Sequence, residues 1–289
     1  MFYLLIFFAV ILVSLTLLAY LGSNYLMARR KPDAAASPAD YDLAFEDIEF
    51  PSGDGTILRG WYLPAQTSNR TIIICSGVSG SIDADVAVLP WVHLLDLNVL
   101  TFDWRAHGRS DGHTATLGYD ERYDLIAAVE FAKACGAAHI GVLGFSMGGA
   151  VALSTAAVCP DIQAVAADSA YVQVATAVAA GLSERGLPES IASLLARLML
   201  FTAGARTGRN WAEADPVRWI DQVAPRPILL LYGERDPFTP RSEVDRLYRR
   251  AGAPKELWRV PDAAHREIQT LHPDEYRQRL TRFFEDNLR

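Results

Sequence analysis

The run Gly144-Phe145-Ser146-Met147-Gly148 is the most informative stretch of this 289-residue chain. It fits the pattern G-x-S-x-G, with a strand-like run at residues 139–143 directly before it and a helix-like run at 149–153 directly after it. A serine in this setting occupies a sharp strand-to-helix turn that projects its hydroxyl above the edge of a sheet. The glycines two residues to either side relieve the crowding of such a turn. The sequence therefore predicts that Ser146 is a nucleophile rather than part of an ordinary turn.

Strand-like and helix-like stretches alternate along residues 41–289. Eight strands are predicted, at residues 45–50, 57–63, 71–75, 98–102, 140–143, 162–167, 228–232 and 257–260. Helices are predicted at residues 85–95, 119–134, 147–158, 241–250 and 273–288. Most of the strand-like runs are continuously apolar, which is typical of strands covered on both faces. This alternation predicts an α/β fold with a mostly parallel sheet and helices on both sides of it.

Residues 170–212 interrupt the alternation because they contain no strand-like run. They hold apolar helical patches instead, most clearly at residues 191–200. Two interpretations remain open: a helical lid inserted over a pocket, or ordinary helices packed at the periphery of the sheet.

The first 28 residues carry no charged side chain, and Arg29, Arg30 and Lys31 follow directly. This run exceeds the roughly 20 apolar residues that a helix needs to cross a bilayer. It also lacks the polar stripe of a helix packed on a soluble domain. A cleaved signal peptide is the competing interpretation, with Ala34-Ala35-Ala36 as its cleavage site. The run is long for a signal peptide, however, and has no basic residue at its start.

We therefore expect a single transmembrane anchor over residues 1–28, a tether over 29–40 and one catalytic domain over 41–289. Positively charged flanks of a membrane span tend to stay in the cytoplasm. Since the basic residues follow the span, the catalytic domain is expected on the cytoplasmic side of the membrane.

Composition excludes several classes of protein and site. Apolar residues make up 51% of the chain, which suits a large core and argues against general disorder. Removing the three basic residues at 29–31 from the 27 Lys and Arg leaves 24 against 34 Asp and Glu, a net charge of −10. Such an acidic body disfavours binding to nucleic acid. The three cysteines lack metal-ligand and C-x-x-C spacing, so we expect free thiols, no disulfide and no metal.

A serine hydroxyl needs a base to remove its proton. His265 is the best candidate, because it follows the last predicted strand in a loop that faces the carboxyl edge of the sheet. Three of the other histidines are expected at the opposite edge or in or beside helices. His107 and His113 lie in a loop that could approach the site and remain rivals.

The base in turn needs an acid that fixes its tautomer and stabilises its charged form. Asp236 follows the predicted strand 228–232 and is therefore expected at the same sheet edge as Ser146. Glu234, two residues away, and Asp168, after the preceding strand, are the alternatives.

The chemistry also needs N–H donors aimed at the oxyanion of a tetrahedral intermediate. One candidate is the backbone N–H of Met147, directly after the nucleophile. The other is the N–H of Val78, in the loop Ser76-Gly77-Val78-Ser79-Gly80 after the third predicted strand. A plain glycine-rich turn is the alternative interpretation of that loop.

Three further stretches carry a resemblance to a known family. Residues 103–110 (DWRAHGRS) resemble a D-x-R-G-x-G-x-S loop after the fourth strand, and residues 117–125 (LGYDERYDL) resemble the loop and helix start that follow. Asp168-Ser169-Ala170-Tyr171 resembles a D-S-P segment after the sixth strand. On these motifs the chain resembles the α/β-hydrolase superfamily. Within it, the closest likeness is to membrane-anchored, serine-aminopeptidase-like (S33-type) hydrolases, over roughly residues 47–284.

The resemblance implies the α/β-hydrolase fold with an eight-stranded sheet, a triad of Ser146, Asp236 and His265, and neither metal nor organic cofactor. Two departures stand out. Ser76-Gly77 replaces the His-Gly that relatives usually have in the oxyanion loop, which changes the shape of the loop but keeps its N–H donor. Ala106 replaces a common glycine, which is expected to cost little if its φ is negative.

These residues together predict a serine hydrolase that transfers an acyl group to water in two steps. A carboxylesterase or lipase-like enzyme, acting on an acyl ester or lipid-like molecule at a membrane, is the first expectation. A peptidase or thioesterase of the same fold and a non-catalytic binding module are the alternatives. The sequence leaves the oligomeric state open.

Overall fold

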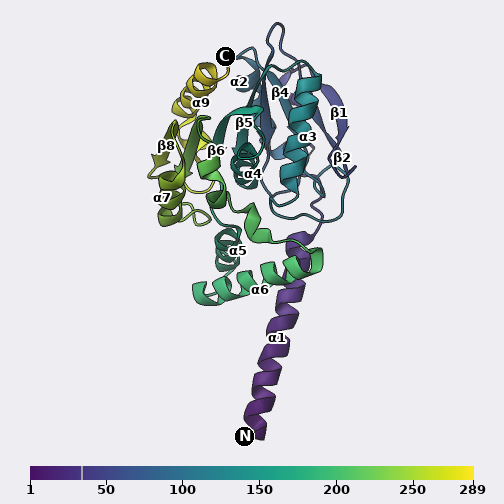
Figure 1. Ribbon diagram of the computed structural model, residues 1–289, viewed down its shortest axis with the longest axis vertical. Coiled ribbons are helices and arrows are strands. Elements are labelled where there is room, and N and C mark those ends of the chain that lie inside the picture. The colour runs from purple at the N-terminus through teal and green to yellow at the C-terminus, as the bar shows by residue number, and fades with distance from the viewer. Residues whose placement is uncertain (34) are drawn as a thin grey trace.

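The computed structural model describes residues 1–33 and 35–289. Ala34, which belongs to the predicted tether and to the alternative cleavage site, lies outside the described residues. The described part contains an eight-stranded sheet with the strand order β1-β2-β4-β3-β5-β6-β7-β8 (Figure 1). Its strands are β1 Glu46–Pro51, β2 Ile57–Leu63, β3 Arg70–Cys75, β4 Asn98–Phe102, β5 His139–Phe145, β6 Ile162–Asp168, β7 Ile228–Gly233 and β8 Lys255–Val260.

Strand direction brings the carboxyl ends of six strands to one edge of the sheet. β2 runs antiparallel to β1 and β4. Every pair from β4 through β3, β5, β6 and β7 to β8 is parallel. Parallel neighbours require long crossover connections, and helices supply most of them here. The predicted eight-stranded, mostly parallel sheet is therefore confirmed.

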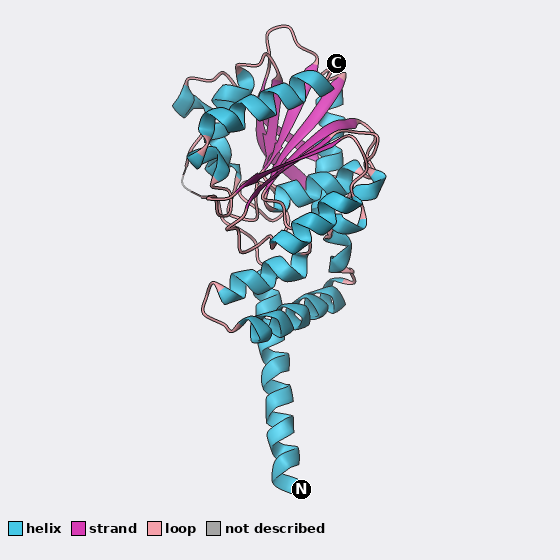
Figure 2. Cartoon of the chain, turned by 90° about the vertical axis from the view of Figure 1, so that its left-hand side faces the viewer, coloured by secondary structure: helices cyan, strands magenta, loops and turns pink. Residues whose placement is uncertain are grey.

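Two apolar cores, one on each face of the sheet, hold the layers together. The helices of the body are α2 Leu89–His93, α3 Glu121–Ala134, α4 Met147–Ala156, α5 Val174–Ser183, α6 Glu189–Thr207, α7 Arg241–Arg250, α8 Ile268–Leu271 and α9 Pro273–Asn287. Alternate residues of β3 point to opposite faces, so Ile73 and Cys75 belong to one core and Ile72 and Ile74 to the other. Helices α3, α4 and α7 cover the first core, and α2, α8 and α9 cover the second. Figure 2 shows helices on both sides of the sheet.

Most predicted boundaries agree with the structure to within two residues. The predicted helix at residues 85–95 is the exception, because the structure has a 3-10 helix, Ile82–Val88, followed by the short α2. Pro90 lies in the first turn of α2. Proline is tolerated there, but it lacks the N–H that would continue an α-helix from the preceding residues. The strand-free segment at residues 170–212 forms α5 and α6.

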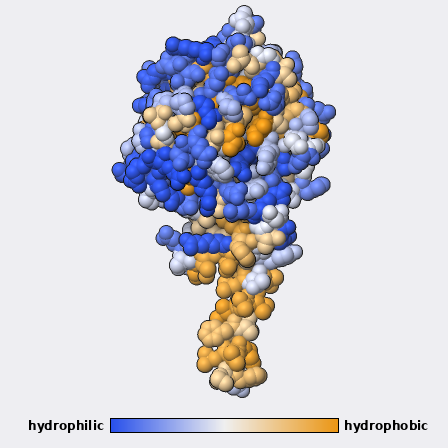
Figure 3. Space-filling view, viewed as in Figure 1, coloured by the Kyte–Doolittle hydropathy of each residue, from blue (hydrophilic) through white to orange (hydrophobic). Residues whose placement is uncertain are grey.

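Helix α1, Phe2–Met27, projects from one end of the body (Figure 1). An 18-residue window of it has a mean hydropathy of 2.8 and is only 6% buried. It is long and apolar enough to span a membrane, a property that a signal sequence near an N-terminus shares. Figure 3 shows it as an apolar stalk below a mostly hydrophilic body. Its last turns pack against α6, and its buried residues are Ala19, Ser23 and Leu26.

The first residues of the predicted tether, residues 29–40, are hydrogen-bonded to the body. Arg29 donates a hydrogen bond to the carbonyl oxygen of Gly108 (2.9 Å). The N–H of Arg30 donates to the carbonyl of Ala106 (2.8 Å), and the N–H of Gly108 donates to the carbonyl of Arg30 (3.1 Å). These paired backbone groups attach the end of α1 to the loop that follows β4.

Ala106 does not meet the condition under which its replacement of glycine was expected to cost little. Its φ is +56°, in the left-handed region that favours glycine, rather than negative. Its N–H donates to the carbonyl of Asp111 (2.8 Å), and its carbonyl accepts from Arg30. The hydrogen bonds of the loop hold Ala106 in this conformation despite its side chain.

A buried ion pair fastens the same loop to α3. Arg105 Nη2 donates to Asp124 Oδ1 (2.7 Å), and the Arg105 backbone N–H donates to Asp124 Oδ2 (3.0 Å). The Arg105 side chain is 7% exposed and that of Asp124 is fully buried. Arg105 Nη2 also donates to Ser52 Oγ, and Arg105 Nη1 donates to Asp54 Oδ2. The loop after β4 therefore has one well-defined place against the body.

We predict that Asp124→Ala destabilises the protein by about 3–5 kcal/mol, because it removes the fully buried counter-ion of Arg105 and leaves the guanidinium paired with Asp54, whose side chain is 53% exposed. Asp111→Ala is the matched control, since it removes a carboxylate of the same loop from an ion pair with Arg59 whose side chains are 36% and 54% exposed. Such exposed pairs contribute about 1 kcal/mol or less. Denaturant unfolding measures both, and equal losses would contradict the role assigned to the buried pair.

Candidate active site

Ser146 occupies the sharp turn between β5 and α4. Its backbone has φ 51° and ψ −114°, a conformation that costs a residue with a side chain about 1–3 kcal/mol. Its N–H donates to the carbonyl of Asp168 at the end of β6 (2.9 Å), which pins the turn to the sheet. A Cβ at Gly144 would collide with the backbone of Gly148, and one at Gly148 with the carbonyl of Cys75. Steric crowding therefore explains both glycines of the motif.

The structure brings Ser146, His265 and Asp236 into one hydrogen-bonded row. With the imidazole proton on Nδ1, His265 donates to Asp236 Oδ2 (2.6 Å), and Ser146 Oγ donates to His265 Nε2 (3.0 Å). The Asp236 side chain is fully buried and that of His265 is 24% exposed. Asp236 Oδ1 also accepts the N–H of Phe238 (2.8 Å), whose ring lies against the imidazole at 4.8 Å between centroids. Phe238 therefore helps to hold both groups in place.

The rival residues make other contacts. Glu234 pairs with Arg241 at 3.6 Å. His107 is buried and its Nδ1 donates to the carbonyl of Arg105 (2.8 Å), while burial lowers its pKa. His113 is exposed and is not among the described residues that line the cavity beside Ser146.

Asp168, the third rival, belongs to a buried network that supports the loop of His265. Tyr276 Oη donates to Asp168 Oδ2 (2.9 Å), and Ser169 Oγ donates to Asp168 Oδ1 (2.9 Å). Ser169 Oγ in turn accepts the N–H of Arg266 (3.0 Å), the residue directly after His265. Burial raises the pKa of Asp168. Asp168 and Ser169 thus support the loop of His265 through hydrogen bonds.

Arg266 fixes the same loop through its side chain. Its guanidinium donates to the buried carboxylate of Asp85 (2.6 Å) and lies over the ring of Phe145 at 4.2 Å. Its φ of +61° is unusual for a residue with a side chain. Burial raises the pKa of Asp85, and the positive charge of Arg266 opposes that shift.

The two N–H groups predicted to bind an oxyanion belong to segments that meet at Ser146. Met147 is the first residue of α4, and the first N–H groups of a helix have no partner within it. A Cβ at Gly77 would lie 3.5 Å from that of Ser146, so the loop that carries Val78 approaches the nucleophile closely. Within residues 1–33 and 35–289, the N–H of Val78 donates to no backbone acceptor. The Trp104 indole N–H donates to the carbonyl of Ser76 (3.0 Å) and steadies the loop.

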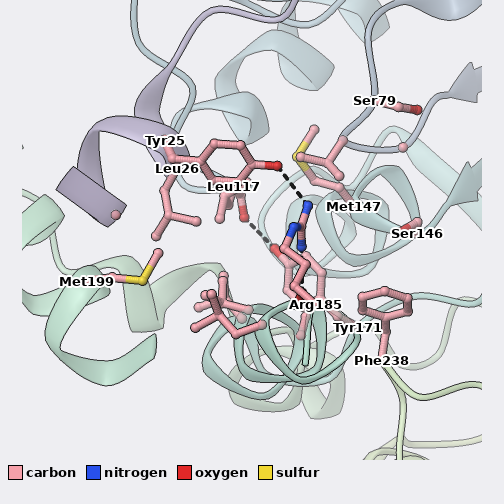
Figure 4. A pocket seen from close by; sticks show the side chains of 18 of the residues that line it. Tyr25, Leu26, Ser79, Leu117, Ser146, Met147, Tyr171, Arg185, Met199 and Phe238 are labelled. Atoms are coloured by element: carbon pink, nitrogen blue, oxygen red, sulfur yellow. Dashed lines mark hydrogen bonds between the residues drawn. The ribbon is translucent and has the colours of Figure 1, made fainter. Parts of the chain in front are cut away.

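A cavity of about 820 Å³ opens beside Ser146 (Figure 4). Ser146, Met147 and His265 line one end of it, and helices α5, α6 and α1 form much of the remaining wall. These helices contribute apolar side chains: Val174, Ala177, Val178 and Leu182 from α5, Leu195 and Met199 from α6, and Leu18, Leu21 and Leu26 from α1. The segment 170–212 thus lies where a lid would lie.

The charged residues that line the cavity, within the described part of the chain, are basic. They are Arg30, Arg185 and Arg266, besides His265, and the lining includes no Asp or Glu. In the same described residues, no group of three or more His, Cys, Asp and Glu is placed to hold a metal ion.

The sequence also places the chain among known proteins. Residues 66–211 match the family model for serine aminopeptidase, S33. The Bacillus subtilis protein YqkD is 31% identical over 256 residues, which cover 84% of this chain and 82% of YqkD. The chain belongs to the serine aminopeptidase S33 family. It has the α/β-hydrolase fold.

A second relative and a solved structure agree with this assignment. This chain is 28% identical to YfhR of Escherichia coli O157:H7 over 247 residues, which cover 82% of this chain and 80% of YfhR. Among solved structures, the Pyrococcus furiosus esterase Pf2001 superposes with a TM-score of 0.78 at 29% identity, over 91% of this chain and 99% of the esterase. The S33-family chain is thus a hydrolase-fold protein with an esterase among its structural neighbours.

The sequence did not single out Phe238, Arg266 or the residues of α1 that line the cavity. Phe238 and Arg266 stand within two residues of Asp236 and His265, so proximity to the predicted acid and base was the available signal. No sequence pattern marks Leu18 or Leu21 as cavity residues, because the helix around them has no polar stripe that would distinguish one face from another.

Proposed function

We propose that this S33-family protein is a membrane-anchored serine esterase. Ser146 is its nucleophile, His265 its general base and acid, and Asp236 the carboxylate that orients His265. The hydrogen-bonded row of these three side chains supports this assignment, since a serine needs a base within reach and the base needs an orienting acid.

The charge of the cavity lining favours an ester over a peptide as the substrate. An aminopeptidase must bind the positively charged α-amino group of its substrate, and an acidic side chain meets that need best. The described lining of the cavity contains three arginines and no carboxylate, so a cationic substrate would meet like charges. An apolar acyl group with a neutral or anionic head fits better. The likeness to the Pyrococcus furiosus esterase Pf2001 points the same way.

The proposed reaction has two steps. Ser146 Oγ attacks the ester carbonyl as its proton passes to His265 Nε2, and the N–H groups of Met147 and Val78 stabilise the oxyanion. His265 then protonates the leaving alcohol, which leaves an acyl group on Ser146. A water molecule that gives its proton to His265 releases the acid and restores the serine.

The membrane anchor is part of the proposal. Helix α1 is long and apolar enough to span a bilayer, and its last turns pack on α6 and line the cavity. Signal cleavage near residue 34 would remove a wall of the active site. An uncleaved anchor therefore fits this architecture better than a signal peptide.

We also propose that the catalytic body faces the cytoplasm, since Arg29, Arg30 and Lys31 follow the span and positive flanks favour that side. Protease added to intact cells should leave the body uncut, while lysed cells should lose it. Digestion in intact cells would reverse the orientation.

The first test of the function is covalent labelling. We predict that a fluorophosphonate probe labels the wild-type protein and not Ser146→Ala, because only an activated serine attacks the phosphorus atom. Gel fluorescence measures the labelling, and Ser154→Ala is a matched control that removes a buried hydroxyl elsewhere on α4.

Equal labelling of the wild type and Ser146→Ala, with both proteins folded, would overturn the enzyme assignment and leave a binding module. The choice of substrate class needs a second comparison, between p-nitrophenyl esters and aminoacyl anilides. Faster turnover of the anilides would show that the protein is a peptidase rather than an esterase.

The role of Asp236 has its own test. We predict that Asp236→Asn lowers kcat for a p-nitrophenyl ester by about 10⁴-fold, because His265 would lose its orienting acceptor. Glu234→Gln removes a carboxylate of the same loop that does not contact His265, and should change kcat less than about twofold. If the two variants lost equal activity, Asp236 would not be the acid.

A further inference from the structure

We propose that the acyl chain of the substrate enters sideways from the bilayer, along a wall formed by the last third of α1. This inference rests on the proposed esterase function and names its substrate class. The substrate is a single-chain acyl ester dissolved in the membrane, whose chain lies between α1, α5 and α6 while its ester bond reaches Ser146.

One cavity joins the nucleophile to the helix that is long enough to span a membrane. Its lining includes Ser146 and His265 as well as Leu18 and Leu21 of α1. Its volume of about 820 Å³ lies within the roughly 300–1,000 Å³ typical of small-molecule sites. That space suits one acyl chain better than a two-chain phospholipid.

The length of α1 sets the depth at which this cavity begins. About 20 residues cross the hydrocarbon core, so a span that starts at Phe2 ends near Leu21. Tyr20 and Tyr25 then lie at the level of the headgroups, where aromatic residues with a polar atom are enriched. Leu18 and Leu21 consequently lie where the acyl chains of the bilayer begin.

Helix α6 lies across α1 at this same level (Figures 1 and 2). Arg206 of α6 donates to Ser23 Oγ (2.6 Å), and its guanidinium lies over the ring of Tyr20 at 4.4 Å. Along its outer side α6 exposes Ile191, Leu194 and Phe201, which are 53%, 51% and 76% exposed. Their spacing of three and seven residues puts them on one stripe of the helix.

This stripe is explained if α6 rests in the membrane interface. Apolar side chains of an in-plane helix insert a few ångströms below the headgroups, and its basic residues stay at their level. The attachment to α1 holds α6 at that depth, because Met199 packs on Gly22, where a Cβ would collide with it. The bilayer therefore meets the cavity on the side where α1 and α6 cross.

A polar contact marks the headgroup level of the entrance. Arg185, just after α5, donates to Tyr25 Oη of α1 (3.0 Å), as Figure 4 shows. Arg30 lines the cavity nearby, with its guanidinium 5.3 Å from the centroid of the Tyr25 ring. These groups suit the polar head of a lipid ester and would exclude its chain, which keeps the chain on the apolar side formed by Leu18, Leu21 and Met199.

The test compares two neighbouring leucines of α1 in the full-length protein, reconstituted in phosphatidylcholine vesicles. Leu18→Trp fills the cavity wall, whereas Leu17→Trp places the same side chain outside the lining, where Leu17 is 56% exposed. We predict that Leu18→Trp lowers kcat/KM for monopalmitoylglycerol in the bilayer about tenfold or more, since several methylene groups lose their contact with the wall. Leu18→Trp should lower the hydrolysis of water-soluble p-nitrophenyl acetate much less than that of monopalmitoylglycerol, as no chain then occupies that wall, and Leu17→Trp should change either activity less than about twofold.

Each other outcome has a distinct meaning. Equal losses for Leu17→Trp and Leu18→Trp on monopalmitoylglycerol would trace the effect to the membrane helix as a whole and overturn the route. If Leu18→Trp lowered the hydrolysis of both substrates equally, the route would also be overturned, because the substitution would then have distorted the active site itself. Hydrolysis of p-nitrophenyl acetate that depends on Ser146, with no turnover of monopalmitoylglycerol by the wild type, would overturn the substrate class alone. Absence of any Ser146-dependent hydrolysis would overturn the esterase proposal and the route with it.

Discussion

The backbone of Ser146 is held in a left-handed conformation that a residue with a side chain adopts only under constraint. Hydrogen bonding to Asp168 on β6 and the absence of side chains at Gly144 and Gly148 impose it. Because of that turn, the hydroxyl points out of the carboxyl edge of the sheet toward His265. Both the cavity and the histidine loop are arranged around this single point.

The groups around the turn are held by buried polar contacts rather than by the apolar core alone. Tyr276, Asp168 and Ser169 form a chain of hydrogen bonds that ends on the N–H of Arg266, and Arg266 closes on Asp85. Buried polar groups of this kind are costly unless every partner is present. The network therefore defines one position for the loop of His265, which is what a base that must meet a serine at hydrogen-bond distance requires.

The apolar helix α1 is continuous with the candidate active site. The loop after β4, fixed by the Arg105–Asp124 pair, binds the backbone of Arg30 and so orients α1 against the body. Helix α6 then packs across α1, and the cavity beside Ser146 extends between them. Helix α1, which is long and apolar enough to span a membrane, is in this arrangement one wall of the cavity beside Ser146.

The sequence by itself determined the sheet, the turn at Ser146 and the candidates His265 and Asp236. Alternating apolar runs and the G-x-S-x-G motif are local signals, and strand order in a parallel sheet then places loop residues at one edge. Only the tertiary structure decided between Asp236, Glu234 and Asp168 as partners of His265, since all three lie near that edge and differ in which side chain each one meets. The left-handed φ of Ala106 and the attachment of residues 29 and 30 also escaped prediction, because they depend on hydrogen bonds between segments some 75 residues apart. The contribution of Leu18 and Leu21 to the cavity is of the same kind. A mostly apolar helix without a polar stripe carries no pattern that says which of its faces will meet another part of the chain.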